Sequence, residues 1–312
     1  MTRSRAVCWL LLAIVAVALS ACGGGHDQSA STAAGEAGFP TTVATANGPV
    51  KIPRRPRRVV SLSATATEDL YAAGAGGRVV AVDSYSTYPP RAPRTKLSGY
   101  EPNIEAIAGY RPDLVVVAED TNRIVAQLGK LGVPVLVEPP ASDLKTAYGE
   151  IEQLGEATGH PAGARRAIAK LKRQIARAVA SVPKPREPLS VYHELDQTYY
   201  SATSHTFIGQ IYKLLGLTNI ADKAKGSGEY PQLSAEYVIA SNPDLIVLAD
   251  TVCCKQSAAT VAARPGWEEI AAVRHGEVVS VDDSIASQWG PRILLFVKKV
   301  ADAVKGLERT SG

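Results

Sequence analysis

Tyrosine is the side chain whose number and placement suggest chemistry in this sequence. The chain has twelve tyrosines against three phenylalanines, and many of the tyrosines fall where short apolar runs end. Ligands of open α/β sheets lie beyond the carboxyl ends of the strands. Amphipathic rings at these positions can stack on a flat conjugated ligand while their hydroxyls bind its edge. For any single tyrosine the alternative is a half-buried ring in a loop. The tyrosines that we assign to a ligand site are Tyr85, Tyr88, Tyr100, Tyr199, Tyr200 and Tyr230.

Four further residues stand near predicted strand ends or helix starts. His193 and Glu194 follow a predicted strand, and Trp289 and Arg292 precede the last predicted helix. Arg292 can pair with an anionic ligand group, in bidentate fashion if that group is a carboxylate. It can equally hold the start of the helix. We assign all four to the ligand site.

The sequence contains none of the patterns that would indicate an enzyme. No GxSxG, HExxH or phosphate-binding loop is present, and "GAGG" at 74–77 follows a predicted helix, whereas a dinucleotide loop follows a strand. The five histidines are scattered. A site for a free transition metal needs several converging ligands, and His193, His205 and Glu194 are too few. We therefore expect no enzymatic activity, no cofactor and no metal site built from the protein's own side chains.

The N-terminal residues are typical of an export signal. Residues 1–21 have a basic start and an apolar run that is shorter than the roughly 20 residues of a spanning helix. The segment "LSAC" resembles the lipoprotein box of bacteria, which predicts lipid on Cys22; a plain secretory signal is the alternative. Residues 22–42 are small and polar, and they predict a flexible tether.

The net charge argues against nucleic acid as a partner. Loss of the signal removes Arg3 and Arg5, so the net charge of +4 falls to +2. The one dense basic run, "PRRPRR" at 53–58, is interrupted by prolines and leads into "VVSL", which suits an exposed lead-in strand.

The adjacent pair Cys253 and Cys254 is the remaining cysteine feature of the exported chain. Adjacent α-carbons lie about 3.8 Å apart, below the usual disulfide range of about 4.4–6.8 Å. An oxidising exterior nevertheless favours closure. We predict a vicinal disulfide in a stiff turn at the edge of the ligand site, with two free thiols as the alternative.

The elements that position these residues alternate between short apolar runs and helical stretches. Runs such as "DLVVVA" are apolar throughout, as in parallel strands that helices cover on both faces. Between two such regions, Ala, Ile and Leu recur at helical spacing with no strong breaker. The predicted fold is α/β, with mainly parallel sheets in two lobes. Its parts are an N-terminal lobe (43–160), one long bridging helix (161–183) and a C-terminal lobe (184–312).

One segment occurs twice. "PNIEAIAGYRPDLVVVAED" at 102–120 and "LSAEYVIASNPDLIVLAD" at 233–250 share a glutamate and a Pro-Asp-Leu triplet, each pair 131 residues apart. The glutamates, Glu105 and Glu236, both stand two residues after an expected N-cap, Asn103 or Ser234. Glutamate is favoured in the first helical turn by the helix dipole alone, so either residue by itself has an ordinary explanation.

These motifs together resemble the substrate-binding proteins of ABC importers for ferric siderophores, haem and cobalamin. The resemblance rests on "RVVSLSATATEDLYAAGAGGRVVAVD", "PNIEAIAGYRPDLVVV", "YPQLSAEYVIASNPDLIVL" and "PGWEEIAAVRHGEVVSVDD", and it extends from about residue 50 to residue 306. It implies a metal-chelate ligand held in a cleft between the two lobes. It also places Tyr85, Tyr100, Tyr200 and Tyr230 at positions of aromatic contact. The sequence shows no cluster of basic residues of the kind that ferric catecholates favour, and it does not choose among the three ligand classes.

The resemblance also implies partners and a location. Glu105 and Glu236 match glutamates that meet arginines on a permease dimer, which works with an ATPase. We expect a monomer on the extracytoplasmic face of the cell membrane, anchored through Cys22. The alternative is a sensor or envelope scaffold with the same fold and no transport role.

Overall fold

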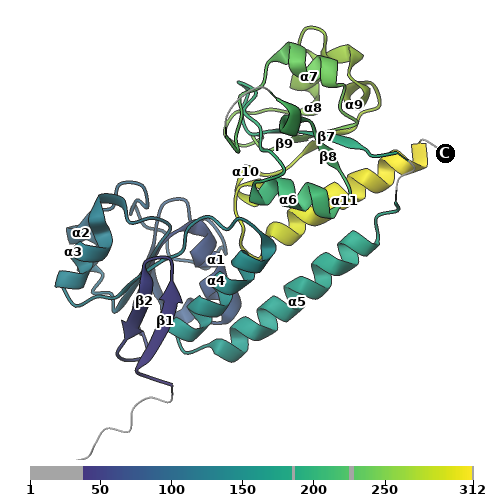
Figure 1. Ribbon diagram of the computed structural model, residues 1–312. Helices are drawn as coiled ribbons and strands as arrows, with labels where there is room; N and C mark the ends of the chain where they lie inside the picture. The colour runs from purple at the N-terminus through teal and green to yellow at the C-terminus, as the bar shows by residue number, and fades with distance from the viewer. Residues whose placement is uncertain (1–37, 185–186, 225–227, 311–312) are drawn as a thin grey trace, which may run out of the picture. The chain divides into compact units, whose positions relative to one another are not determined.

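A computed structural model describes residues 38–184, 187–224 and 228–310 of the chain. The predicted signal segment, residues 1–21, and the predicted lipidation residue Cys22 lie outside these ranges. The described chain begins with an antiparallel hairpin, β1 (Thr41–Thr45) and β2 (Gly48–Ile52), drawn in purple in Figure 1. The folded body therefore begins slightly before the predicted start at Val43, within the last residues assigned to the tether.

The N-terminal lobe contains a four-stranded parallel sheet with the strand order β4-β3-β5-β6. Strand side chains alternate between two apolar clusters, one shared with α1 and α4 and the other with α2 and α3. Helices therefore cover both faces, which explains why "LVVV" is apolar at every position. The strands are β3 (Val59–Leu62), β4 (Val79–Val82), β5 (Leu114–Val117) and β6 (Val135–Val137). The helices are α1 (Ala64–Ala73), α2 (Ile104–Gly109), α3 (Ile124–Lys130) and α4 (Leu144–Ala157).

The C-terminal lobe has the same arrangement. Its parallel sheet has the order β10-β9-β7-β8, so in both lobes the first strand lies between the second and the third. The strands are β7 (Ser190–Glu194), β8 (Thr218–Asn219), β9 (Leu245–Leu248) and β10 (Val278–Ser280). The helices are α6 (Phe207–Leu214), α7 (Ala235–Ser241), α8 (Ala258–Ala262), α9 (Ala271–Arg274), α10 (Asp283–Ala286) and α11 (Ile293–Thr310). The predicted pair of α/β lobes is confirmed.

The repeated Pro-Asp-Leu triplet has a structural role in each sheet. The Asp113 carboxylate accepts hydrogen bonds from the backbone N–H groups of Arg57 and Arg58, directly before β3. In the other lobe, Asp244 accepts from the backbone N–H of Ser190, at the start of β7. Each aspartate therefore fixes the start of the third strand against the start of the first.

One helix, α5 (Pro161–Ala180), joins the two lobes (Figure 1). Pro161 occupies its first turn, where the missing N–H costs nothing. Residues buried at helical spacing form its apolar face, which packs on α1 and α4 of one lobe and α11 of the other. The predicted bridging helix is confirmed, although it ends at Ala180 and not at residue 183.

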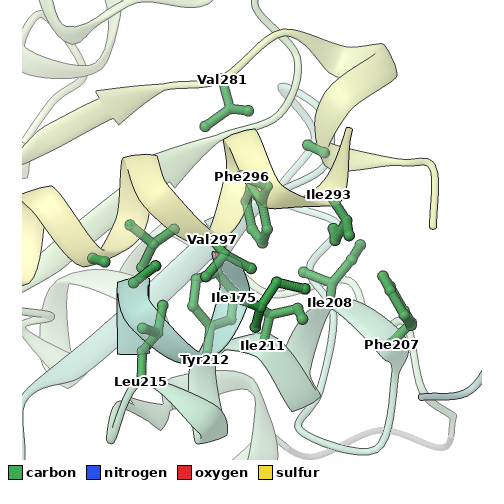
Figure 2. Close-up of a cluster of buried hydrophobic side chains, with 14 of the residues drawn as sticks. Ile175, Phe207, Ile208, Ile211, Tyr212, Leu215, Val281, Ile293, Phe296 and Val297 are labelled. Carbon is green, nitrogen blue, oxygen red and sulfur yellow. The ribbon is translucent and has the colours of Figure 1, made fainter. Parts of the chain in front are cut away.

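The C-terminal core holds the far end of this bridge. Figure 2 shows Ile175 of α5 among the apolar side chains of α6 and α11. Phe296 and Tyr212 are fully buried there. Because α5 packs on helices of both lobes, it is an integral part of the fold and not a linker.

The basic run at 53–58 is not the lead-in strand that we predicted. It forms a loop between β2 and β3, and two of its arginines donate to carbonyl groups at helix ends. Arg55 donates to Gly159 O at 3.0 Å, just after α4, and Arg58 donates to Tyr110 O at 2.7 Å, at the end of α2. Cations are favoured at helix C-termini, where carbonyl groups lack partners.

A helix that crosses a bilayer needs about 20 mostly apolar residues. Within the described ranges, every helix is too short or too polar to cross a bilayer.

Candidate functional site

A cavity of about 640 Å³ lies between segments of the two lobes. The N-terminal lobe lines it with residues that follow β3, β4, β5 and β6. The C-terminal lobe lines it with residues that follow β9 and β10. All of these segments lie beyond the carboxyl ends of parallel strands, where ligands of such sheets bind. The predicted ligand residues that line the cavity are Tyr85, Tyr100 and Trp289.

Tyr85 and Tyr100 form an exposed aromatic pair on the N-terminal wall. Their rings meet edge to face with centroids 5.6 Å apart. Tyr85 is 61% exposed and Tyr100 is 74% exposed, so much of each ring is free to contact a ligand. Gly99 permits this placement, because a Cβ at that position would lie 2.3 Å from the carbonyl oxygen of Leu62.

Trp289 lines the cavity from the C-terminal lobe and also joins the lobes. Its indole Nε1 donates to Glu150 Oε2 of α4 at 2.6 Å. This bond orients the ring in the lining of the cavity.

Arg292 binds a protein carboxylate and does not line the cavity. Its Nε and Nη2 atoms both lie 2.7 Å from Glu68 Oε1, and Glu68 is buried on α1. The guanidinium carbon lies 4.6 Å from the centroid of the Tyr88 ring, which is likewise outside the lining. Arg292 therefore has a structural role, as in the second of the two interpretations given above, and does not meet a ligand in this conformation. Tyr88 packs on its guanidinium group.

His193 and Glu194 are fully buried, so neither can reach a ligand in this conformation. His193 Nδ1 and the Tyr212 hydroxyl are hydrogen-bonded at 2.6 Å, and burial lowers the pKa of His193 to about 3. Both oxygens of Glu194 accept from Arg264 at 2.6 Å. The prediction for this pair is wrong because β7 is a central strand, and its side chains are covered on both faces.

The other three predicted tyrosines lie outside the cavity lining. Tyr199 stacks on the buried Trp267, with centroids 5.8 Å apart, beneath the guanidinium of Arg264. Tyr200 is 41% exposed and Tyr230 is 50% exposed. The structure therefore does not bring these three rings together with Tyr85 and Tyr100.

Cys253 and Cys254 are free thiols, so the predicted vicinal disulfide is not formed and the alternative holds. Their turn is held by a carboxylate instead. Asp283 accepts from the backbone N–H of Val252 at 2.8 Å and of Cys253 at 2.7 Å. Cys253 lines the cavity, as expected for a turn at its edge.

The carboxylates of the lining were not among the predicted site residues. They are Asp83, Glu119, Asp282 and Asp283, and each follows a strand at its carboxyl end. The rule that identified the tyrosines would have identified these residues too, had it been applied to acids. Within the described ranges, no group of three or more His, Cys, Asp or Glu residues is placed to hold a metal ion.

Four buried carboxyl groups interact with one another in the N-terminal lobe. They are Glu68, Asp69, Glu138 and Glu150, and each has an oxygen without a hydrogen-bond partner among the described residues. Burial, reinforced by the charge of Glu150, raises the pKa of Glu138 to about 8. Burial raises the pKa of Glu150 to about 7, against the opposing effect of the Trp289 bond. The only cation described in contact with this group is Arg292, on Glu68.

We expect the free energy of unfolding to fall as pH rises from about 5 to about 8, by on the order of 1–3 kcal/mol. In that window the folded state keeps the proton of Glu138, whose pKa is about 8, whereas the unfolded chain has lost it near the ordinary value of 4.5. The folded state binds more protons, so a rise in pH favours unfolding. Urea denaturation across this range measures the slope.

A Glu138→Gln variant should flatten this slope and be more stable than the wild type at about pH 8. Glu152→Gln, an exposed change on α4, is the control and should leave the slope unchanged. A slope in Glu138→Gln as steep as in the wild type would contradict the assignment.

Glu105 and Glu236 are exposed at equivalent positions, each in the first turn of a short helix. Asn103 caps α2 by accepting from Ala106 N, and Ser234 caps α7 by accepting from Tyr237 N. Both predicted N-caps are confirmed. Hydrogen bonding from its own backbone N–H and from Ser234 lowers the pKa of Glu236.

Comparison with known proteins supports the same class. The family model described as periplasmic binding protein matches residues 59–285. An uncharacterised ABC transporter substrate-binding lipoprotein of Bacillus subtilis is 32% identical, over 97% of this chain and 98% of its own length. A cobalamin-binding protein of Halobacterium salinarum is 32% identical, over 85% of this chain and 74% of its own length.

A solved structure has the same fold. The periplasmic haem-binding protein from Roseiflexus sp. RS-1, in its apo form, matches with a TM-score of 0.70 and 26% identity, over 81% of this chain and 99% of its own. The family match, the relatives and the shared two-lobed fold lead to one conclusion. The chain belongs to the periplasmic binding protein family, in the class of substrate-binding proteins of ABC transporters.

Proposed function

We propose that this protein captures a cobalamin-type metal chelate outside the cytoplasm and delivers it to an ABC importer. The observation that carries the proposal is the cavity of about 640 Å³ between the strand ends of two lobes, lined by Tyr85, Tyr100 and Trp289. Ligand sites in α/β proteins have this location, and cavities of this size take ligands much larger than an amino acid.

The chemistry of the lining suits a large chelate with a flat conjugated ring. The exposed faces of Tyr85 and Tyr100 can stack on such a ring, and their hydroxyls can bind polar groups at its edge. The chelate brings its own metal, which makes the metal part of the cargo and not a resident cofactor. No catalytic step is required of the protein.

Cobalamin is our first candidate because a relative that is 32% identical is named as cobalamin-binding. Haem is the second candidate, because a structural neighbour at 26% identity is named as haem-binding. Ferric siderophores form the third class implied by the sequence resemblance.

The proposal includes the setting in which the protein works. Lipid on Cys22 would anchor a monomer to the outer face of the cell membrane, with the predicted tether between the lipid and the folded body. Glu105 and Glu236 would dock the two lobes on the two halves of a permease dimer, whose ATPase drives import. A sensor or scaffold without transport remains the competing function, and uptake that is unchanged in a strain lacking the permease would favour it.

Tryptophan fluorescence tests the proposed cargo. Trp289 lines the cavity and Trp267 is fully buried, so a ligand in the cavity should quench mainly Trp289. We expect saturable quenching of the purified protein by cobalamin at submicromolar concentration, after correction for ligand absorbance. Saturation by haem or by a ferric siderophore, and not by cobalamin, would overturn the choice of cargo.

Tyr100→Ala should weaken binding of cobalamin by about ten- to a hundredfold, because it removes the more exposed ring of the wall. Tyr230→Ala is the matched control, since Tyr230 is half exposed but outside the lining. Equal losses in the two variants would contradict the proposed position of the ligand.

A further inference from the structure

The lining of the cavity carries charge of one sign. Its described residues include four carboxyl groups and no lysine, arginine or histidine. Glu119 follows β5 on the N-terminal wall, and Asp282 and Asp283 follow β10 on the C-terminal wall. Acidic side chains therefore stand on both sides of the space that a ligand would occupy.

Three of the four carboxylates supply the negative charge of the lining on which the inference depends. Partial burial acts to raise the pKa of Asp283, but the backbone N–H groups of Val252 and Cys253 outweigh it and lower that pKa. Asp282 caps α10 by accepting from the backbone N–H and hydroxyl of Ser284. Glu119 is exposed. By contrast, burial raises the pKa of Asp83, which is bound to the Ser86 hydroxyl, so we leave it out of the charge argument.

Three arginines outside the lining are bound to other protein groups. Arg292 is bound to the buried Glu68, and Arg264 is bound to Glu194. Arg94 donates to the carbonyl oxygens of Ser86 and Thr87 from outside the lining. Lys255 follows the Cys253 turn, but it is also outside the lining.

From this distribution we infer that the cavity selects chelates that are neutral or positively charged and rejects anionic chelates of the same shape. The inference rests on the proposed function and narrows its substrate class. Walls of low dielectric constant focus the field of charges in a cleft, so a ligand anion meets repulsion that water does not fully screen. Carboxylate oxygens accept hydrogen bonds only, so they suit a ligand with N–H donors at its edge.

This charge requirement separates the three candidate cargoes. Corrinoids have primary amides around the ring, and these amides are neutral donors that the carboxylates can accept from. Ferric trihydroxamates are neutral, or cationic when they carry a free amine. Haem carries two propionates and ferric tricatecholates are strongly anionic, so the inference excludes both classes.

A matched series of corrinoids tests the inference in the intact protein. The series is aquocobalamin, which is cationic; cyanocobalamin, which is neutral; and the monocarboxylic acid of cyanocobalamin, in which one edge amide is hydrolysed to a carboxylate. We expect the acid to bind about tenfold or more weakly than cyanocobalamin at low salt. The difference should shrink as salt rises, because salt screens charge.

Two conservative variants locate the source of the selectivity. Glu119→Gln with Asp282→Asn removes charge from both walls, and asparagine still caps a helix. The double variant should bind the acid more tightly and aquocobalamin more weakly than the wild type, with cyanocobalamin unchanged. Glu152→Gln, an exposed acid on α4 outside the lining, should leave the whole series unchanged.

The outcomes of these experiments test the charge inference separately from the proposed function on which it rests. If the acid binds as tightly as cyanocobalamin at low salt, the charge inference is overturned and the cobalamin proposal stands. If no corrinoid binds but a cationic ferric trihydroxamate binds better than a ferric tricatecholate, the charge inference stands and the choice of cargo falls. If only haem or a ferric tricatecholate binds, both are overturned.

Discussion

Replacing Glu105 and Glu236 together by alanine is expected to abolish uptake of the ligand and to leave its affinity for the purified protein unchanged. Both side chains are exposed in the first turn of a capped helix, one in each lobe, at equivalent positions of the repeated segment. Neither residue lines the cavity. An exposed carboxylate at such a position is free to pair with a partner's cation, and two anchors fix the orientation of a two-lobed body.

The control for this experiment is a second pair of exposed glutamates, one from each lobe. Glu152→Ala with Glu268→Ala removes the same charge from other parts of the surface and should leave uptake near the wild-type rate. Single Glu105→Ala and Glu236→Ala variants should each lose part of the uptake. Normal uptake by the Glu105→Ala, Glu236→Ala protein would show that these residues do not dock, and a loss of affinity would place them at the ligand instead.

Replacing Arg292 by alanine is expected to destabilise the protein by about 3–5 kcal/mol at neutral pH, because it leaves the carboxyl group of Glu68 buried without its cation. Glu68 Oε1 accepts from Arg292 at 2.7 Å, and its Oε2 has no partner among the described residues. Asp69, Glu138 and Glu150 surround the same region, so no other described cation can replace the lost one.

Urea denaturation measures this loss, and pH identifies its cause. Burial raises the pKa of Glu68 while Arg292 lowers it, so in the variant Glu68 takes up a proton more readily. The difference from the wild type should therefore shrink as pH falls from neutral towards the pKa of Glu68 in the wild type, which burial holds above the ordinary value of 4.5. Asp302→Asn, which breaks the exposed pair with Lys305, should cost less than about 1 kcal/mol. A loss of similar size in the two variants would contradict the role given to Arg292.

The local pattern of the sequence was sufficient for the elements and for their arrangement in two lobes. Fully apolar runs predicted parallel strands, apolar residues at helical spacing predicted α5, and Asn103 and Ser234 predicted two helix starts. These features depend on neighbours within a few residues, so a sequence displays them directly. The repeated Pro-Asp-Leu triplet lies at equivalent positions of the two lobes, and the bonds of Asp113 and Asp244 explain why it recurs.

Part of the candidate site could also be predicted from the sequence. Residues beyond the strand ends were expected at the cavity, and Tyr85, Tyr100 and Trp289 line it. The rule is topological, because it says which end of a strand faces the ligand. It does not say which strands of a sheet border the cavity, and segments after β7 and β8 are absent from the described lining.

Partners far apart in the chain decided the rest. His193 and Glu194 follow the same rule of position, yet β7 is a central strand, so Tyr212 and Arg264 bury them. The sequence allowed Arg292 to contact a ligand, but the fold brings it to Glu68, 224 residues away in the chain. The sequence by itself determined the elements, the two lobes and the end of each sheet where a ligand binds, because these follow from local periodicity. Only the tertiary structure decided which polar groups are already paired and which face the cavity, because burial and pairing depend on contacts between distant segments.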